Sequence, residues 1–170
     1  MCHDSAMRKA LLSLLPLLGC APSLHSPEPG AVAAVEATLN ELHAAAARAD
    51  GGSYFSLFTD NATYIGTDAS EHWTIDEFRA FAEPYFSKGR GWTYRPRERH
   101  VTMPAIPCRC IAWFDELLDS ETYGTSRGTG VLVKRGNAWK IAQYALTFPV
   151  PNDLAEGMTN QIKAFEATKR

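Results

Sequence analysis

The stretch YGTSRGTGVLVKRGNAWKIAQYALTFPVPN, residues 123–152, decides the fold because it holds two apolar runs, 130–134 and 138–148, rich in β-branched and aromatic residues. Between the runs lies Arg135-Gly136-Asn137, a polar turn in which Gly and Asn tolerate positive φ. Two such runs around so short a connection predict an antiparallel hairpin. Both runs alternate, so another part of the chain must bury one face of the hairpin.

The segments around this hairpin supply helices and further strands. Thr74 and Glu77 have the spacing of a capping box, which marks a helix start, and Pro84 should kink that helix or end it early. Helices followed by a four-strand antiparallel meander indicate an α+β domain. We expect helices over residues 31–49, 53–58, 73–87 and 152–168, and strands over residues 62–66, 92–103, 108–118 and in the hairpin.

Composition limits the class of protein. The chain has 170 residues, 45% of them hydrophobic and 21% charged, which suits one globular domain with a real core. The net charge is -2 and no run of Lys or Arg is present. We therefore expect neither nucleic acid nor an anionic membrane surface as a partner.

The first twenty residues resemble a bacterial lipoprotein signal. Arg8-Lys9 precede the short apolar run 10–18, and a small residue stands directly before Cys20. This resemblance implies that residues 1–19 are a signal peptide, that Cys20 is lipidated, and that the mature protein lies in the bacterial cell envelope, facing the periplasm or the exterior, with the lipid as its only membrane anchor. Residues 20–30 then form a flexible tether. An ordinary secretory signal with an incidental Cys, or a buried helix start, is the alternative. Translation starts at Met1 or at Met7, of which Met7 would be the more typical start for such a signal.

The remaining cysteines favour a structural role. Cys108 and Cys110 share one face of a predicted strand, and a bridge between such near neighbours strains disulfide geometry. A metal site would need further ligands, and His100 is the one nearby candidate. We expect two buried thiols that act as small hydrophobes. The sequence has no metal motif, nucleophile elbow, phosphate loop or dinucleotide fingerprint, so we predict neither metal nor cofactor.

The order of elements resembles the nuclear transport factor 2-like fold, and most closely its SnoaL-like branch. The resemblance covers residues 31–155 and leaves 156–170 as a C-terminal helix. It is carried by the segments 55–58, 60–62, 64–68, 112–116, 127–132 and 139–144. The resemblance implies a curved sheet wrapped around helices as a cone, a pocket in its mouth, and a homodimer formed through the outer sheet face. Many relatives carry His on the last strand, where this chain has Gln143 and Ala145. The departure argues against chemistry that depends on His.

Asp115 is the strongest candidate for chemistry. If it faces the pocket, burial raises its pKa and makes it a general base, with Arg127 or Tyr144 stabilising the anion. If Arg127 pairs with it, the two form a clamp that orients the substrate or stabilises the fold. Alternatively, Asp115 or its neighbour Glu116 pairs with an Arg on the exposed face, because adjacent strand residues point to opposite sides.

The remaining candidates would form an aromatic pocket. The predicted ligand-contacting residues are Tyr64, Trp73, Phe78, Trp92, Trp113 and Gln143. Arg95, Arg97 and Arg99 alternate and either hold an anion or form cross-strand pairs. Three functions stay open: binding of a small hydrophobic molecule without catalysis, a lyase, isomerase or cyclase that uses Asp115, and a dimerising scaffold.

Overall fold

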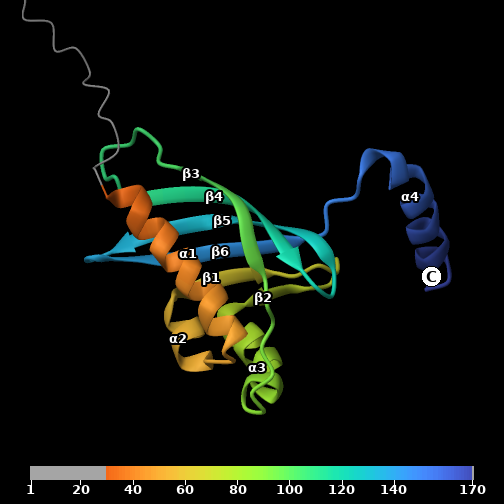
Figure 1. Ribbon diagram of the computed structural model, residues 1–170, viewed down its shortest axis with the longest axis horizontal. Helices are drawn as coiled ribbons and strands as arrows, with labels where there is room; N and C mark the ends of the chain where they lie inside the picture. Colours follow the sequence, from red (N-terminus) through yellow and green to blue (C-terminus); the bar gives the residue numbers. More distant parts are fainter. Residues whose placement is uncertain (1–29, 170) are drawn as a thin grey trace, which may run out of the picture.

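The architecture is an α+β domain in which helices cover one face of a curved six-stranded sheet (Figure 1). The computed structural model describes residues 30–169, so the predicted signal, Cys20 and most of the tether lie outside the described residues. The helices are α1 Ala31–Ala47, α2 Gly51–Ser56, α3 Ile75–Phe86 and α4 Asn152–Ala167. The strands are β1 Phe58–Ile65, β2 His72–Thr74, β3 Arg95–Thr102, β4 Ile111–Ser120, β5 Gly124–Arg135 and β6 Ala138–Thr147.

The predicted hairpin is the pair β5 and β6 at the centre of the sheet. Gly136 takes φ 59° in its turn, as the polar connection requires. The strands lie in the order β2-β1-β6-β5-β4-β3, so the predicted four-strand meander is confirmed as β3 to β6. The expected strand 62–66 is longer at its start, since β1 begins at Phe58, and it pairs parallel with β6. This parallel neighbour makes the sheet mixed.

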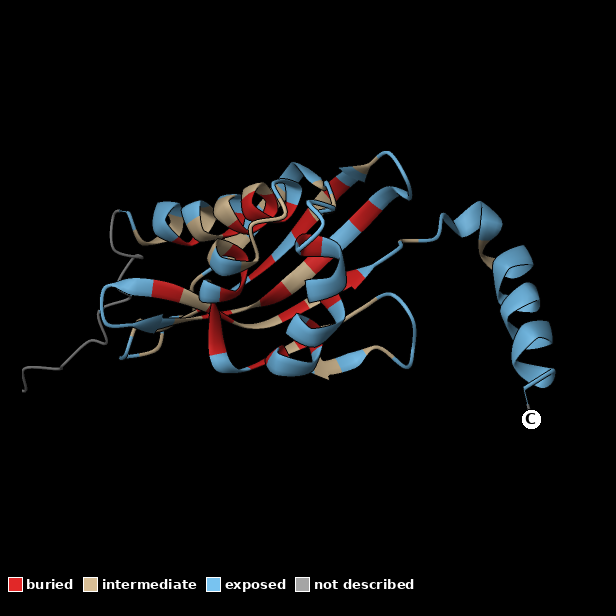
Figure 2. Ribbon diagram, turned by 90° about the horizontal axis from the view of Figure 1, so that it is seen from below, coloured by how far each residue is buried: buried red, intermediate tan, exposed pale blue. Residues whose placement is uncertain are grey.

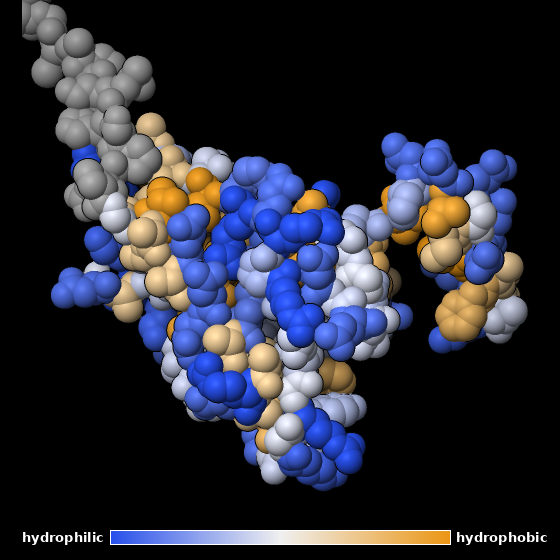
Figure 3. All heavy atoms as spheres, viewed as in Figure 1, coloured by the Kyte–Doolittle hydropathy of each residue, from blue (hydrophilic) through white to orange (hydrophobic). Residues whose placement is uncertain are grey.

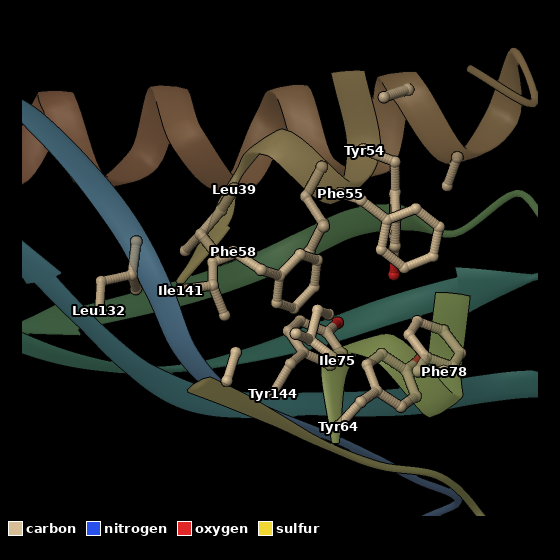
Figure 4. Close-up of a cluster of buried hydrophobic side chains, with 14 of the residues drawn as sticks. Leu39, Tyr54, Phe55, Phe58, Tyr64, Ile75, Phe78, Leu132, Ile141 and Tyr144 are labelled. Carbon is tan, nitrogen blue, oxygen red and sulfur yellow. The ribbon is translucent and has the colours of Figure 1, made fainter. Parts of the chain in front are cut away.

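One face of the sheet carries the core and the other is open (Figure 2). Leu39 of α1 and Tyr54 of α2 pack with Phe58, Ile141 and other inward side chains of the strands (Figure 4). Because alternate strand residues point to opposite sides, β4 and β5 bury every second residue along most of their length. The buried apolar residues of α1, among them Val35, Leu39 and Leu42, pack in the core against this inner face.

Helix α3 begins at the predicted capping box. The Thr74 hydroxyl accepts a hydrogen bond from the Glu77 amide, and the Glu77 carboxylate accepts one from the Thr74 amide at 2.8 Å. Pro84 lies inside the helix, which ends two residues later at Phe86. Trp73 lies before the helix, in β2. The short second helix begins earlier than expected, at Gly51, because the Asp50 side chain caps it through the Ser53 amide.

Replacing Thr74 by Ala is expected to lower the free energy of unfolding by about 1 kcal/mol, because it removes the hydroxyl that accepts a hydrogen bond from the Glu77 amide. Urea unfolding of the variant measures this loss. Thr38→Ala is the matched control, since the Thr38 hydroxyl bonds only the Ala34 carbonyl within α1. An equal loss in both variants would contradict the capping argument.

The prediction of two buried thiols is wrong. Cys108 and Cys110 form a disulfide, with their Cα atoms 5.1 Å apart, in the turn between β3 and β4. Cys108 is exposed, and β4 begins only at Ile111. Arg109 between the two cysteines takes φ 44°, a left-handed conformation that allows so short a bridge. The strand geometry assumed from alternation therefore does not apply at these two residues.

Helix α4 stands apart from the rest of the domain (Figure 1). None of its side chains is buried. Pro151 occupies the N-cap position of α4. No helix within residues 30–169 is long and apolar enough to cross a membrane.

Candidate functional site: an aromatic cleft at the end of the sheet

A cleft of about 330 Å³ opens at the end of the sheet where β1 and β6 finish. Its walls come from β1, β2, α3, the 90–94 segment, the turn before β5 and the residues that follow β6. The lining residues are Tyr64, Gly66, Thr67, Glu71, Trp73, Phe78, Phe81, Tyr85, Arg90, Gly91, Trp92, Tyr94, Tyr123, Leu146 and Phe148. Two of these fifteen carry a formal charge, so the cleft is mainly apolar and aromatic.

Stacked rings form one wall of the cleft. Tyr64 and Phe78 lie with centroids 3.7 Å apart and planes at 10° (Figure 4). Trp73 stacks on Phe81 at 5.0 Å and 24°. The register places Trp73 opposite Tyr64, and Tyr64 opposite Tyr144, across three adjacent strands. Phe81 ends the series at 45% exposure, so one aromatic face of the wall meets solvent.

A small void of about 10 Å³ lies behind this wall and shares Tyr64, Trp92 and Tyr94 with the cleft. It has room for about one water molecule. Its lining also includes His43 of α1 and Tyr144 of β6, together with Leu42, Ala46, Tyr54 and Leu146. The polar side chains of His43 and Tyr144 thus border a void directly behind the cleft wall.

Both of these side chains bond one buried carboxylate, that of Glu116 on β4. Glu116 is 0% exposed. One oxygen, Oε1, lies 2.7 Å from His43 Nε2 and accepts a hydrogen bond from the Tyr144 hydroxyl at 3.1 Å. The other, Oε2, accepts one from Arg99 Nε at 2.8 Å. We call His43, Arg99, Glu116 and Tyr144 the buried carboxylate network.

The electrostatics of the network keep Glu116 ionised. Burial alone would raise its pKa, but the hydrogen bond with His43 and the nearby charges of His43 and Arg99 outweigh burial and lower it. Burial raises the pKa of Tyr144 far above its ordinary value, and that of Tyr64 as well. It raises the pKa of Tyr94 to about 12. These phenols are therefore neutral at physiological pH, and the Tyr144 hydroxyl donates its hydrogen bond to Glu116.

The structure brings four of the predicted ligand-contacting residues to the cleft. Tyr64, Trp73, Phe78 and Trp92 all line the cleft. Tyr144 lies behind it, buried in the network. The register of β2, β1 and β6 brings Trp73, Tyr64 and Tyr144 together, whereas Phe78 comes from α3 and Trp92 from the 90–94 segment.

Of the two orientations left open for Asp115, the inward one is wrong. Asp115 is 52% exposed and its carboxylate lies 3.3 Å from His100 on the outer face of the sheet. Arg127 is also exposed, and it is opposite Leu117 rather than Asp115 in the register. Trp113 shares the outer face at 46% exposure. The reason is strand parity, since β4 buries its even-numbered residues 112 to 118.

Gln143 does not line the cleft either. It pairs with Val131, whose neighbours Gly130 and Leu132 are the buried residues of β5, so it lies on the outer face. The register shifts between Val131 and Leu132, which leaves Ala142 as the extra residue of a bulge. This bulge lets Ile141 and Tyr144 both face inward.

The sequence interpretation missed Glu116, His43 and Arg99 as one network. One signal was available for His43, which lies four residues after Leu39 on the apolar stripe of α1. The other two arginines of the alternating series form exposed cross-strand pairs: Arg95 with Glu121 and Arg97 with Asp119. Arg99 alone turns inward. Within residues 30–169, no cluster of three or more His, Cys, Asp or Glu is placed to hold a metal ion.

Comparison with known proteins agrees with this geometry. The cone of helices and curved sheet is that of the cystatin-like α+β proteins. A SnoaL-like domain model matches residues 35–151, and the chain belongs to this family. No curated protein matches the sequence.

Solved structures with the same fold are distant in sequence. An NTF2-like protein of unknown function from Pseudomonas putida is 12% identical, with a TM-score of 0.57 over 69% of this chain and 86% of its own. A cystatin-like domain of unknown function from Nostoc punctiforme is 16% identical, with a TM-score of 0.58 over 81% and 94%. A provisionally named dehydratase of the NTF2-like family from Streptomyces avermitilis is 12% identical, with a TM-score of 0.59 over 71% and 96%. Identities this low establish the fold alone.

Proposed function

We propose that the protein binds a small, planar, mainly apolar molecule of about two rings in the aromatic cleft. The observation that carries this proposal is the exposed end of the ring stack, Trp73 on Phe81, in a cleft of about 330 Å³. A cavity of about 150 Å³ holds one benzene ring, so this volume suits roughly two. A flat aromatic ligand would continue the stack and gain the offset ring contacts that the wall already uses.

The proposal favours binding over catalysis. Asp115 and Arg127, the predicted catalytic pair, lie on the outer face of the sheet. The inward carboxylate of Glu116 is fully buried and bonded to His43, Arg99 and Tyr144, so it is not presented to a ligand in the cleft. A lyase or isomerase would have to break this network to use it. A dehydratase-like reaction therefore has less support than simple binding.

Titration with 2-naphthol, indole and 4-phenylphenol, followed by tryptophan fluorescence quenching, tests the proposal. We expect saturable binding of at least one of these ring compounds with one site per chain. Phe81→Ser should weaken that binding at least about tenfold, because it removes the outer ring of the stack.

Trp113→Ser is the matched control for this experiment. Trp113 and Phe81 are almost equally exposed, at 46% and 45%, but Trp113 lies on the opposite face of the sheet. The control should bind as the unmodified protein does. No saturable binding of any probe, or equal weakening in both variants, would contradict the proposed function.

A further inference from the structure

Helix α4 presents an apolar face that nothing in its own chain covers. Leu154, Met158, Ile162 and Phe165 recur at helical spacing and are 40–60% exposed. Hydrophobic residues gather on this helix in the surface view (Figure 3). We call these four residues the α4 stripe. A stripe of this size on a detached helix requires a partner surface, because water solvates it poorly.

The contacts of α4 with its own domain are electrostatic at most. Apart from contacts with its flanking residues Pro151, Thr168 and Lys169, α4 has no hydrogen bond, ion pair or ring contact to the rest of residues 30–169. Hydrogen bonds from Ser70 lower the pKa of Asp68, and the charge of Lys169, just beyond α4, adds a smaller lowering. The far end of the helix thus comes near the β1–β2 loop without packing on it.

The charges of α4 disfavour a membrane as the partner. Residues 152–169 carry Asp153, Glu156 and Glu166 against Lys163 and Lys169. Helices that lie on anionic bilayers have Lys- and Arg-rich polar faces. The polar side of α4 lacks that excess, so a protein surface is the better match for the α4 stripe.

The linker before α4 is stiffened by two prolines. It consists of Phe148, Pro149, Val150 and Pro151. Each proline fixes its own φ, and each restricts the preceding residue to extended conformations. A linker of this kind is a semi-rigid spacer. Packing of the α4 stripe on its own cleft would require the linker to bend back sharply.

An apolar surface of the right kind lies at the root of the same linker. Phe81, Tyr85, Tyr123 and Phe148 are exposed aromatic residues that line the cleft mouth, and Tyr123 stacks on Phe148 at 4.8 Å. Phe148 is also the first residue of the linker. The α4 stripe and the cleft mouth are thus two exposed apolar surfaces joined by one short linker, and a two-fold dimer can pair each with the other.

We propose that two copies of the chain exchange α4, each packing its α4 stripe over the cleft mouth of the other. The contact forms twice in such a symmetric dimer, which doubles the buried apolar area. The cleft of each copy is then closed by a helix from its partner. This dimer uses α4 and the cleft mouth, whereas the dimer expected from the family resemblance uses the outer sheet face. The proposal does not depend on the identity or presence of a ligand.

Photo-crosslinking in a mixture of isotopically labelled and unlabelled full-length chains tests the exchange. Met158 is replaced by p-benzoylphenylalanine, and crosslinked peptides are identified by mass spectrometry. We expect crosslinks to the peptide that contains Phe81 and Tyr85 or to the peptide that contains Tyr123. When labelled and unlabelled chains are present in equal amounts, about half of these crosslinks should join a labelled chain to an unlabelled one. Crosslinks only within one chain would show α4 closing on its own cleft and would overturn the proposal. So would the absence of crosslinks to the cleft mouth.

Sedimentation velocity of charge variants gives an independent readout. Ile162→Glu places a charge in the α4 stripe and should weaken dimerisation at least about thirty-fold. Gln161→Glu adds the same charge on the neighbouring polar side and should leave the dimer intact. Trp113→Glu, on the outer sheet face, should also leave it intact. Loss of the dimer in Trp113→Glu with an intact dimer in Ile162→Glu would assign dimerisation to the sheet and overturn the exchange.

Discussion

Glu116→Gln is expected to lower the free energy of unfolding by about 3 kcal/mol, the largest single-residue effect that we predict. Glutamine keeps the shape of the side chain but removes the negative charge. Arg99, at 10% exposure, then stays buried beside a neutral amide, and His43 loses its carboxylate partner. Removing one partner of a buried ion pair typically costs about 3–5 kcal/mol. The lower end applies here because Arg99 keeps a hydrogen bond to Asn40.

Asp115→Asn is the control for this experiment. It makes the same chemical change one residue earlier in β4, where the carboxylate is half exposed and faces His100. An exposed pair of this kind contributes about 0–1 kcal/mol, so the control should lose little stability. Urea unfolding at pH 7 gives both values. Equal losses in the two variants would mean that the network contributes no more than a surface pair.

The stability difference between the unmodified protein and Glu116→Gln should also depend on pH. The pKa of Glu116 is lower in the folded protein than in the unfolded chain. A carboxyl group whose pKa is lowered on folding stabilises the fold at pH values above its pKa in the unfolded chain, which is about 4.3 for Glu. That contribution to stability is lost as the pH falls through the pKa that Glu116 has in the folded protein. The difference between the two proteins should therefore be full at pH 7 and should shrink below about pH 4.

Local signals in the sequence predicted the elements well. The turn at Gly136 sets the central hairpin, and the Thr74–Glu77 box starts α3, because each depends on residues close together in the chain. The aromatic wall was also predictable, since Tyr64 and Trp73 stand in segments whose apolar residues must face the core. These features need no knowledge of how distant strands pair.

The orientation of the carboxylates was not predictable from the same signals. Asp115 and Glu116 are neighbours on one strand, so one of them must face inward, and alternation alone does not say which. The choice depends on the distant partners His43 on α1 and Arg99 on β3, which the fold brings to Glu116. The bulge at Ala142 likewise turns Gln143 outward, and no residue pattern in β6 marks it. The disulfide of Cys108 and Cys110 depends on a left-handed residue between them that alternation conceals.

Gly128→Ala is expected to destabilise the protein by about 2–3 kcal/mol, through overpacking beside the buried carboxylate network. Gly128 lies opposite Glu116 in the register of β4 and β5 and is buried. A Cβ atom at this position would overlap the Tyr144 hydroxyl and come within 3.0 Å of Glu116 Oε1. The sheet backbone holds residue 128 in place, so the hydroxyl must move and its hydrogen bond to Glu116 must lengthen or break.

A double-mutant cycle with Tyr144→Phe separates this clash from a general intolerance of the strand to alanine. Tyr144→Phe alone should cost about 1 kcal/mol, the value of one hydrogen bond. In the double variant the hydroxyl that meets the new Cβ atom is absent. The stability loss of the double variant should therefore be at least about 1 kcal/mol smaller than the sum of the losses in the two single variants. Gly157→Ala, in α4 with open space around it, should cause no loss. Additive losses in the cycle would place the cost of Gly128→Ala in the backbone of β5, because the clash with Tyr144 would then contribute nothing.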